Sequence, residues 1–174
     1  ILNNSSIFFT SSNLSNVYPK FPCKFSGFWA CRWRLLRCLL SEAYAVNWLG
    51  PDRAAQMTRL GSLERHGVPL TLHSDAPMAP LSPLTLVWAA SERQTISGAR
   101  GLKAERLSRA SALKAVTSGA AKVIGREHDI GSIRAGKRAD FVVLAEDPMT
   151  AAADALRDIK VEATVFSGKA YPIP

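Results

Sequence analysis

Residues 68–77 read Val68-Pro-Leu-Thr-Leu-His-Ser-Asp-Ala-Pro77, an apolar run that gives way to polar residues and a proline. The run is too short for a helix and rich in Val, Leu and Thr, so it predicts a buried β-strand over Val68–Ser74. Alternation along a strand places Thr71, His73 and Asp75 on the face opposite the two leucines. The sequence therefore predicts a carboxylate, that of Asp75, at or just past the end of a strand, where barrel enzymes hold their catalytic groups.

Helices are predicted on both sides of this strand, over residues 53–66, 83–93 and 109–124. Gly67 fits the end of the first helix, and Ser82 followed by a proline is a good start for the second. The third follows the candidate cap Ser108, ends at Gly125, and offers an apolar face made of Ala112, Leu113, Val116, Ala120, Val123 and Ile124. This alternation of helix and strand predicts an α/β fold.

From Ile130 onward the apolar period changes from helical to two. Gly131-Ser-Ile133 and Phe141–Leu144 flank a turn, a helical stretch is expected at Ala151–Leu156, and Val161–Phe166 leads through Ser167-Gly-Lys169 into another short run. Ser-Gly between two alternating runs is a hairpin signal. We expect at least three strands between Gly131 and Tyr171, outside any barrel.

Three motifs along the chain carry a family resemblance: His73-Ser-Asp-Ala-Pro77, Ser111-Ala-Leu-Lys-Ala-Val-Thr117 and Gly131-Ser-Ile-x-x-Gly-Lys-x-Ala-Asp140. In this order and at this spacing they resemble the C-terminal part of a metal-dependent amidohydrolase of the amidohydrolase superfamily, in its amidohydrolase 3 or N-substituted formamide deformylase-like branch. The resemblance covers residues 49–174. It implies the terminal part of a (β/α)8 (TIM) barrel over residues 49–126, followed by strands of a small β-sandwich over 127–174. Because a complete barrel needs about 250 residues, we expect this 174-residue chain to be a fragment.

The resemblance implies a hydrolase of carbon–nitrogen bonds other than peptide bonds, with a small-molecule amide-type substrate and a divalent metal, zinc by expectation. In such enzymes the carboxylate that ends the last barrel strand contacts the metal and accepts a proton from the metal-bound water, and both roles fall to Asp75. An aspartate at the end of a strand more often only caps a turn, here the one before Pro77. The order of the three motifs favours the catalytic interpretation.

The other ligands that the resemblance implies are absent from the sequence. No His-x-His pair occurs anywhere, and no histidine precedes His66. Since a catalytic metal needs about three protein ligands, we expect this chain alone to bind no metal and to be inactive. We expect His73 to make hydrogen-bonded packing inside the barrel mouth and His66 and His128 to lie solvated in loops. Arg93 is expected to favour the C-terminal dipole of its helix rather than to meet a substrate carboxylate, so the substrate-binding residues stay unknown.

The Gly131–Asp140 motif is interpreted as structural. Gly136 permits a tight turn, Lys137 and Arg138 are expected to be exposed, and Asp140 is expected to accept backbone hydrogen bonds where the next strand begins. The glycine spacing does not fit a phosphate-binding loop.

Residues 1–48 differ from the rest of the chain. They carry five basic residues against one glutamate, a net charge of +4, and all three cysteines, with no sustained apolar period. We expect this segment to be divergent, non-native or frame-shifted, and to pack irregularly. The alternative is a basic aromatic module that binds a nucleic acid or an anionic membrane surface through Lys24, Phe25, Phe28, Trp29, Arg32, Trp33, Arg34 and Arg37.

The cysteines Cys23, Cys31 and Cys38 are odd in number and their spacing matches no zinc or redox motif, which is typical of reduced thiols. No window holds the ~18 uninterrupted apolar residues of a membrane span, and the polar, uncharged N-terminus is unlike a signal peptide. The leading expectation is therefore a cytoplasmic chain with neither nucleic acid nor membrane as a partner. Its oligomeric state stays unknown.

Overall fold

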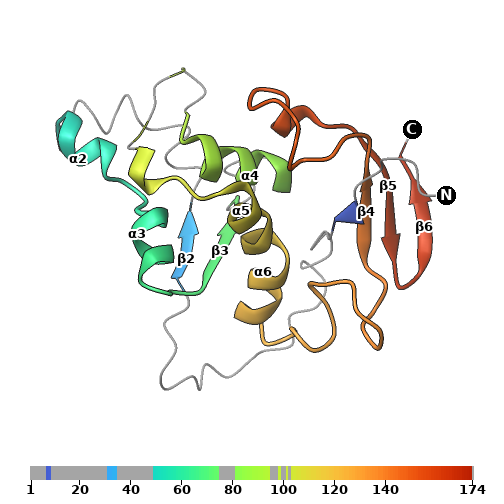
Figure 1. Ribbon diagram of the computed structural model, residues 1–174. Coiled ribbons are helices and arrows are strands. Elements are labelled where there is room, and N and C mark those ends of the chain that lie inside the picture. Colours follow the sequence, from blue (N-terminus) through green and yellow to red (C-terminus); the bar gives the residue numbers. More distant parts are fainter. Residues whose placement is uncertain are drawn as a thin grey trace.

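The computed structural model describes residues 7–8, 31–34, 49–74, 81–94, 98, 101 and 103–173 (Figure 1). Two separate sheets organise these residues. A parallel pair is formed by β2 (Cys31–Arg34) and β3 (Leu70–His73), and an antiparallel sheet has the strand order β1-β4-β5-β6. The strands of the second sheet are Ile7–Phe8, Phe141–Leu144, Val161–Phe166 and Lys169–Pro172.

Helices surround the parallel pair. They are α2 (Pro51–Ala55), α3 (Leu60–Arg65), α4 (Pro83–Glu92), α5 (Arg109–Val116) and α6 (Ser118–Val123), with 3-10 turns η1 (Lys103–Glu105) and η2 (Leu156–Asp158). Figure 1 shows α3 and α6 on either side of β3, with the antiparallel sheet beyond α6. The core runs through both parts, because Leu60, Leu72 and Val87 belong to the same buried cluster as Leu144 and Leu156.

The predicted strand is confirmed over Leu70–His73. The predicted starts of the two following helices are also confirmed: the Ser82 hydroxyl accepts a hydrogen bond from the Thr85 amide (3.3 Å), and that of Ser108 accepts one from the Ser111 amide (3.1 Å). These hydroxyls satisfy amides that have no partner within their own helices. The α/β alternation on both sides of β3 therefore follows the sequence pattern.

Two predicted helices are each broken in two. Residues 53–66 form α2 and α3, because Thr58 adopts a left-handed backbone (φ 54°) between them. Residues 109–124 form α5 and α6, because Thr117 leaves the helical region (φ −121°, ψ −98°) while its hydroxyl donates to the Leu113 carbonyl (2.7 Å). A β-branched residue held in such a conformation departs from its local preference, so packing decides both breaks.

The C-terminal strands are confirmed as β4, β5 and β6. Ser167 and Gly168 both have positive φ (50° and 81°), the type I′ geometry that fits the twist of a two-residue hairpin. The prediction that residues 131–133 are extended is wrong. The chain bends at residues 131 and 132, because Gly131 has a left-handed backbone (φ 84°). Residues 151–156 form turns that lead into η2 instead of a helix.

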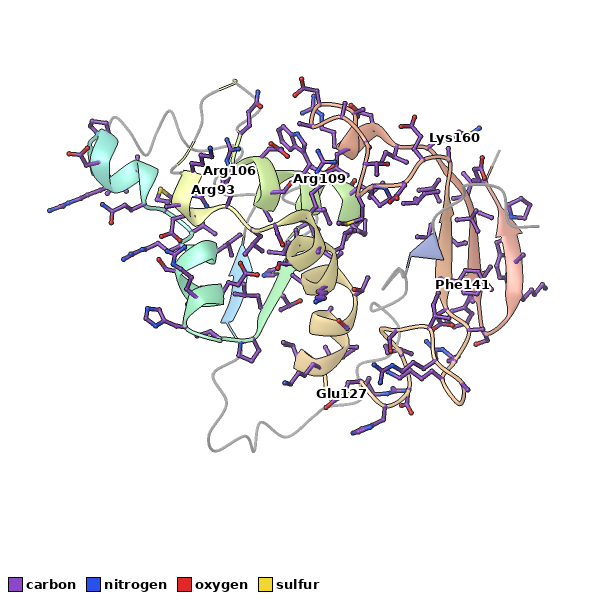
Figure 2. The ribbon with its side chains drawn as sticks, viewed as in Figure 1. Arg93, Arg106, Arg109, Glu127, Phe141 and Lys160 are labelled. Atoms are coloured by element: carbon purple, nitrogen blue, oxygen red, sulfur yellow. The ribbon has the colours of Figure 1, made fainter. Side chains whose placement is uncertain are left out.

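Arg109 connects the helices to the antiparallel sheet. Its Nη1 atom donates to the carbonyl groups of Ala151 and Pro148 (3.4 Å for the latter) in the loop after β4, and its Nη2 lies 3.7 Å from a Glu92 carboxylate oxygen. Arg106 approaches the same Glu92 at 3.9 Å, and Arg106 and Arg109 both lie beside α4 in Figure 2. The first residue of α5 thereby ties the helical part to the loop that follows β4.

Within the described stretches, the strands form the parallel pair β2–β3 and one four-stranded antiparallel sheet, so the barrel and the β-sandwich stay predictions. The segment 1–48, which we expected to be irregular, supplies two short strands there: β1 pairs antiparallel with β4, and β2 pairs with β3. None of the helices in these stretches is long and apolar enough to cross a bilayer.

Candidate active-site strand

The candidate site lies at the carboxyl end of β3. Leu72 is buried in the core, Thr71 and Ser74 are buried at 8% and 5% exposure, and His73 is half-buried. The parallel register sets Arg34 of β2 opposite His73. Asp75 follows Ser74 directly, but it lies outside the described residues, as do residues 76–80. Its catalytic and metal-binding assignments therefore stay predictions.

Arg93 is a buried residue at the end of α4. It is 7% exposed, has a left-handed backbone (φ 53°), and donates from Nη1 to the Thr58 carbonyl (2.7 Å) and from Nη2 to the Met57 carbonyl (2.6 Å). In Figure 2 it lies between α4 and η1. These bonds tie the end of α4 to the break between α2 and α3, so the guanidinium organises backbone rather than acting only on the helix dipole.

The two loop histidines lie as expected. His66 follows α3 and His128 follows α6, and both are exposed. Among the described residues, no group of three or more His, Cys, Asp or Glu side chains could hold a metal ion. The donor set that the described part of the chain offers thus does not fit a catalytic metal, which needs about three ligands.

Glu105 is a charged residue that the sequence pattern did not single out. Its side chain is 5% exposed, and its carboxylate accepts hydrogen bonds from the Ser62 amide (2.8 Å) and the Ser62 hydroxyl (2.5 Å). Arg59 and Arg65 each lie 3.6 Å from the same carboxylate. Burial raises the pKa of Glu105, but the Ser62 hydrogen bonds and the two arginines lower it by more, so the pKa lies below its ordinary value. No local signal marks Glu105, because its partner is 43 residues away.

The Gly131–Asp140 motif is confirmed as structural, with one correction. Gly136 has φ 86°, and Asp140 accepts a hydrogen bond from the Ser167 amide (2.8 Å) in the β5–β6 turn. Arg138 is exposed as expected and pairs with Asp140. Lys137, expected to be exposed, is half-buried: its ammonium donates to the Ser132 hydroxyl (2.7 Å) and to the carbonyl groups of Ile130 (3.2 Å) and Glu127, because these acceptors converge inside the loop.

The family model described as "Amidohydrolase family" matches residues 29–171. The chain belongs to this amidohydrolase family. The match begins upstream of residue 49, so this amidohydrolase chain includes β2 in its family region, and it runs through β3 and the helices to β6.

Curated relatives and a solved structure agree with this membership. The chain is 38% identical to an N-substituted formamide deformylase of Arthrobacter pascens over 102 residues, which is 59% of this chain and 19% of that protein. It is 30% identical to the putative amidohydrolase YtcJ of Bacillus subtilis (strain 168) over 129 residues, 72% of this chain and 24% of that protein. An uncharacterized metal-dependent hydrolase from Pyrococcus furiosus matches with a TM-score of 0.54 and 31% identity, over 66% of this chain and 23% of that one. This amidohydrolase chain thus spans about a fifth to a quarter of its curated relatives.

Proposed function

We propose that the chain contributes the strand-end carboxylate of a metal-dependent hydrolase that cleaves carbon–nitrogen bonds of amides, formamides or cyclic amides. The observation that carries the proposal is the family match over residues 29–171, which includes the strand β3 that leads to Asp75. The identity with a formamide deformylase over 102 residues supports the amide class of substrate.

Asp75 would act as the acid and base of the reaction. Its carboxylate takes a proton from the attacking water as the new C–O bond forms, and gives this proton to the departing nitrogen as the C–N bond breaks. Asp75 is the only metal ligand that we propose in this chain. Among the described residues no group of three His, Cys, Asp or Glu side chains could supply the others. We assign His73, two residues earlier on β3, to support of this strand end rather than to the chemistry.

The chain alone is proposed to be inactive. A catalytic zinc ion needs about three protein ligands, and one carboxylate does not suffice. The purified chain should therefore bind less than stoichiometric zinc and hydrolyse amides no faster than they hydrolyse in buffer alone. Zinc content by atomic absorption and an amine-release assay with a panel of N-substituted formamides measure these two properties. Metal-dependent turnover by the chain alone would contradict this part of the proposal.

The decisive experiment supplies the missing part of the enzyme. The full chain is joined behind the upstream region of the Arthrobacter pascens deformylase, in place of the segment that it matches, and assayed for formamide hydrolysis. Asp75→Asn in this hybrid should lower kcat by about two to four orders of magnitude, the range for a positioned acid or base. Asp154→Asn, at an exposed position near η2, makes the same chemical change and should leave kcat unchanged. Full activity of the Asp75→Asn hybrid would refute the assignment.

A further inference from the structure

The helix α6 lies directly on the backbone of β3. Gly119, in α6, has no side chain at this contact, and a Cβ there would come within 2.6 Å of the Leu70 carbonyl oxygen and 2.9 Å of the Lys114 carbonyl oxygen. Both neighbours are backbone atoms that no rotamer change can move. Only glycine therefore allows α6 to approach the strand this closely.

The Gly131–Asp140 motif packs on the other side of α6. A Cβ on Gly131 would overlap the Cβ of Ala121 and lie 3.2 Å from the Ser118 Cα and the Thr117 carbonyl oxygen. Ala121 is itself buried at 2% exposure. The helix thus lies between β3 and the motif (Figure 1). A glycine is present at each of these two contacts.

Hydrogen bonds fix the shape of the motif and tie it to the segment that follows α6 and to the β5–β6 turn. Lys137 donates to the Ile130 carbonyl and the Ser132 hydroxyl, on either side of Gly131, and to the Glu127 carbonyl just beyond the end of α6. Asp140 fixes the far end of the motif to the β5–β6 turn through the Ser167 amide. These hydrogen bonds restrict the backbone of the motif at both ends, so that Gly131 stays packed against Ala121.

From this stack we infer that the Gly131–Asp140 motif positions the end of β3, with Gly119 and Gly131 as the two positioning residues. The motif packs α6 against the backbone of β3, where His73 follows Leu70 along the strand. Asp75 comes two residues later in the sequence. The inference rests on the proposed function only in naming this strand end as the catalytic one. It assigns to the motif a role in site geometry without contact to any reacting atom. Substitutions at these glycines should raise amide hydrogen exchange in β3 more than in α4.

The test is amide hydrogen exchange on the full chain, which requires no activity. Gly119→Ala should accelerate exchange of the amides of residues 71–73 about ten- to hundredfold relative to those of α4, the range for a methyl group forced into a packed interface. Gly61→Ala is the matched control: it also places a Cβ against a backbone oxygen, that of Ala104, but at the contact between α3 and η1. It should leave the ratio of β3 to α4 exchange unchanged.

A second pair keeps the test valid where Gly119→Ala does not fold. Gly131→Ala should loosen β3 more than Gly125→Ala, because both glycines have positive φ but a Cβ on Gly125 meets no atom within 4 Å. Adding Ala121→Gly to Gly131→Ala removes the overlapping methyl group and should restore most of the lost protection of β3. Equal acceleration of β3 and α4, or no rescue by Ala121→Gly, would overturn the inference. An inactive hybrid enzyme with this rescue intact would refute the proposed function alone.

Discussion

Replacing Glu105 should destabilise the fold through the amino end of α3. In α3 the Ser62 amide is among the first N–H groups, which have no partner within a helix. The side chain of Arg59, at the cap position, accepts no hydrogen bond from these amides. The Glu105 carboxylate satisfies this amide and the Ser62 hydroxyl together. Hydrogen bonds to a charged group contribute about 1.5–3 kcal/mol.

The two arginines add little to this interaction, because their side chains are 58% and 59% exposed and such pairs contribute about 0–1 kcal/mol each. We therefore expect Glu105→Ala to lower the free energy of unfolding by about 2–4 kcal/mol and Glu105→Gln, which keeps an acceptor, by about 1–2 kcal/mol. Urea unfolding followed by circular dichroism measures both. Glu64→Gln, at an exposed position of the same helix, makes the same charge change and should cost less than about 0.5 kcal/mol.

The contribution of Glu105 should also depend on pH. Its folded-state pKa lies below the unfolded value of about 4.3. The stabilisation is therefore complete above about pH 4.3 and is lost as the pH falls through the lower, folded-state pKa. The difference in unfolding free energy between the natural chain and Glu105→Gln should shrink in this acidic window. A difference that stays constant below pH 4, or a Glu105→Gln variant as stable as Glu64→Gln, would refute the reasoning.

Three further predictions concern single contacts. Asp140→Ala should lower the free energy of unfolding by about 1–3 kcal/mol, because the Ser167 amide loses its acceptor. Hydrogen exchange of the Ser167 amide should then rise by more than that of the β4 amides, and an unchanged rate would show that this bond does not hold the turn. Lys137→Met should cost about 1–3 kcal/mol because acceptors in the loop lose their donor, whereas the exposed Lys122→Met should be neutral in the same thermal unfolding assay. Ser82→Ala should cost about 1 kcal/mol through loss of the α4 cap, which Ser82→Asp should restore in urea titrations.

The parts of the fold set by local chemistry were predictable. The caps at Ser82 and Ser108, the apolar strand before Ser74 and the Ser-Gly turn at 167–168 depend on neighbouring residues, and all appear where the pattern places them. The family resemblance also rested on short local motifs, and the family model confirms the family.

The parts set by distant partners were not predictable. The break at Thr58 lies where the Arg93 guanidinium donates hydrogen bonds to two backbone carbonyl groups. The burial of Lys137 depends on acceptors that converge only when the loop folds. β2 was not expected: Cys31–Arg34 does alternate apolar and charged residues, but these four residues are too few to stand out in a stretch without a sustained period. The strand depends on its pairing with β3. Of the candidate site, the strand was found and the loop histidines were placed in solvent as expected, while the geometry at Asp75 lies outside the described residues.

The dependence of α3 on Glu105 also bears on the order of folding. A helix of six residues is far shorter than the about 12–15 that an isolated helix needs in water, and its amino end is capped by a residue 43 positions later in the chain. The chain between Ser62 and Glu105, which includes β3 and α4, must be closed into a loop before this contact can stabilise the helix. We expect α3 to be a product of tertiary assembly: as a free peptide it would be unfolded, and in the folding chain it would be among the last helices to become stable.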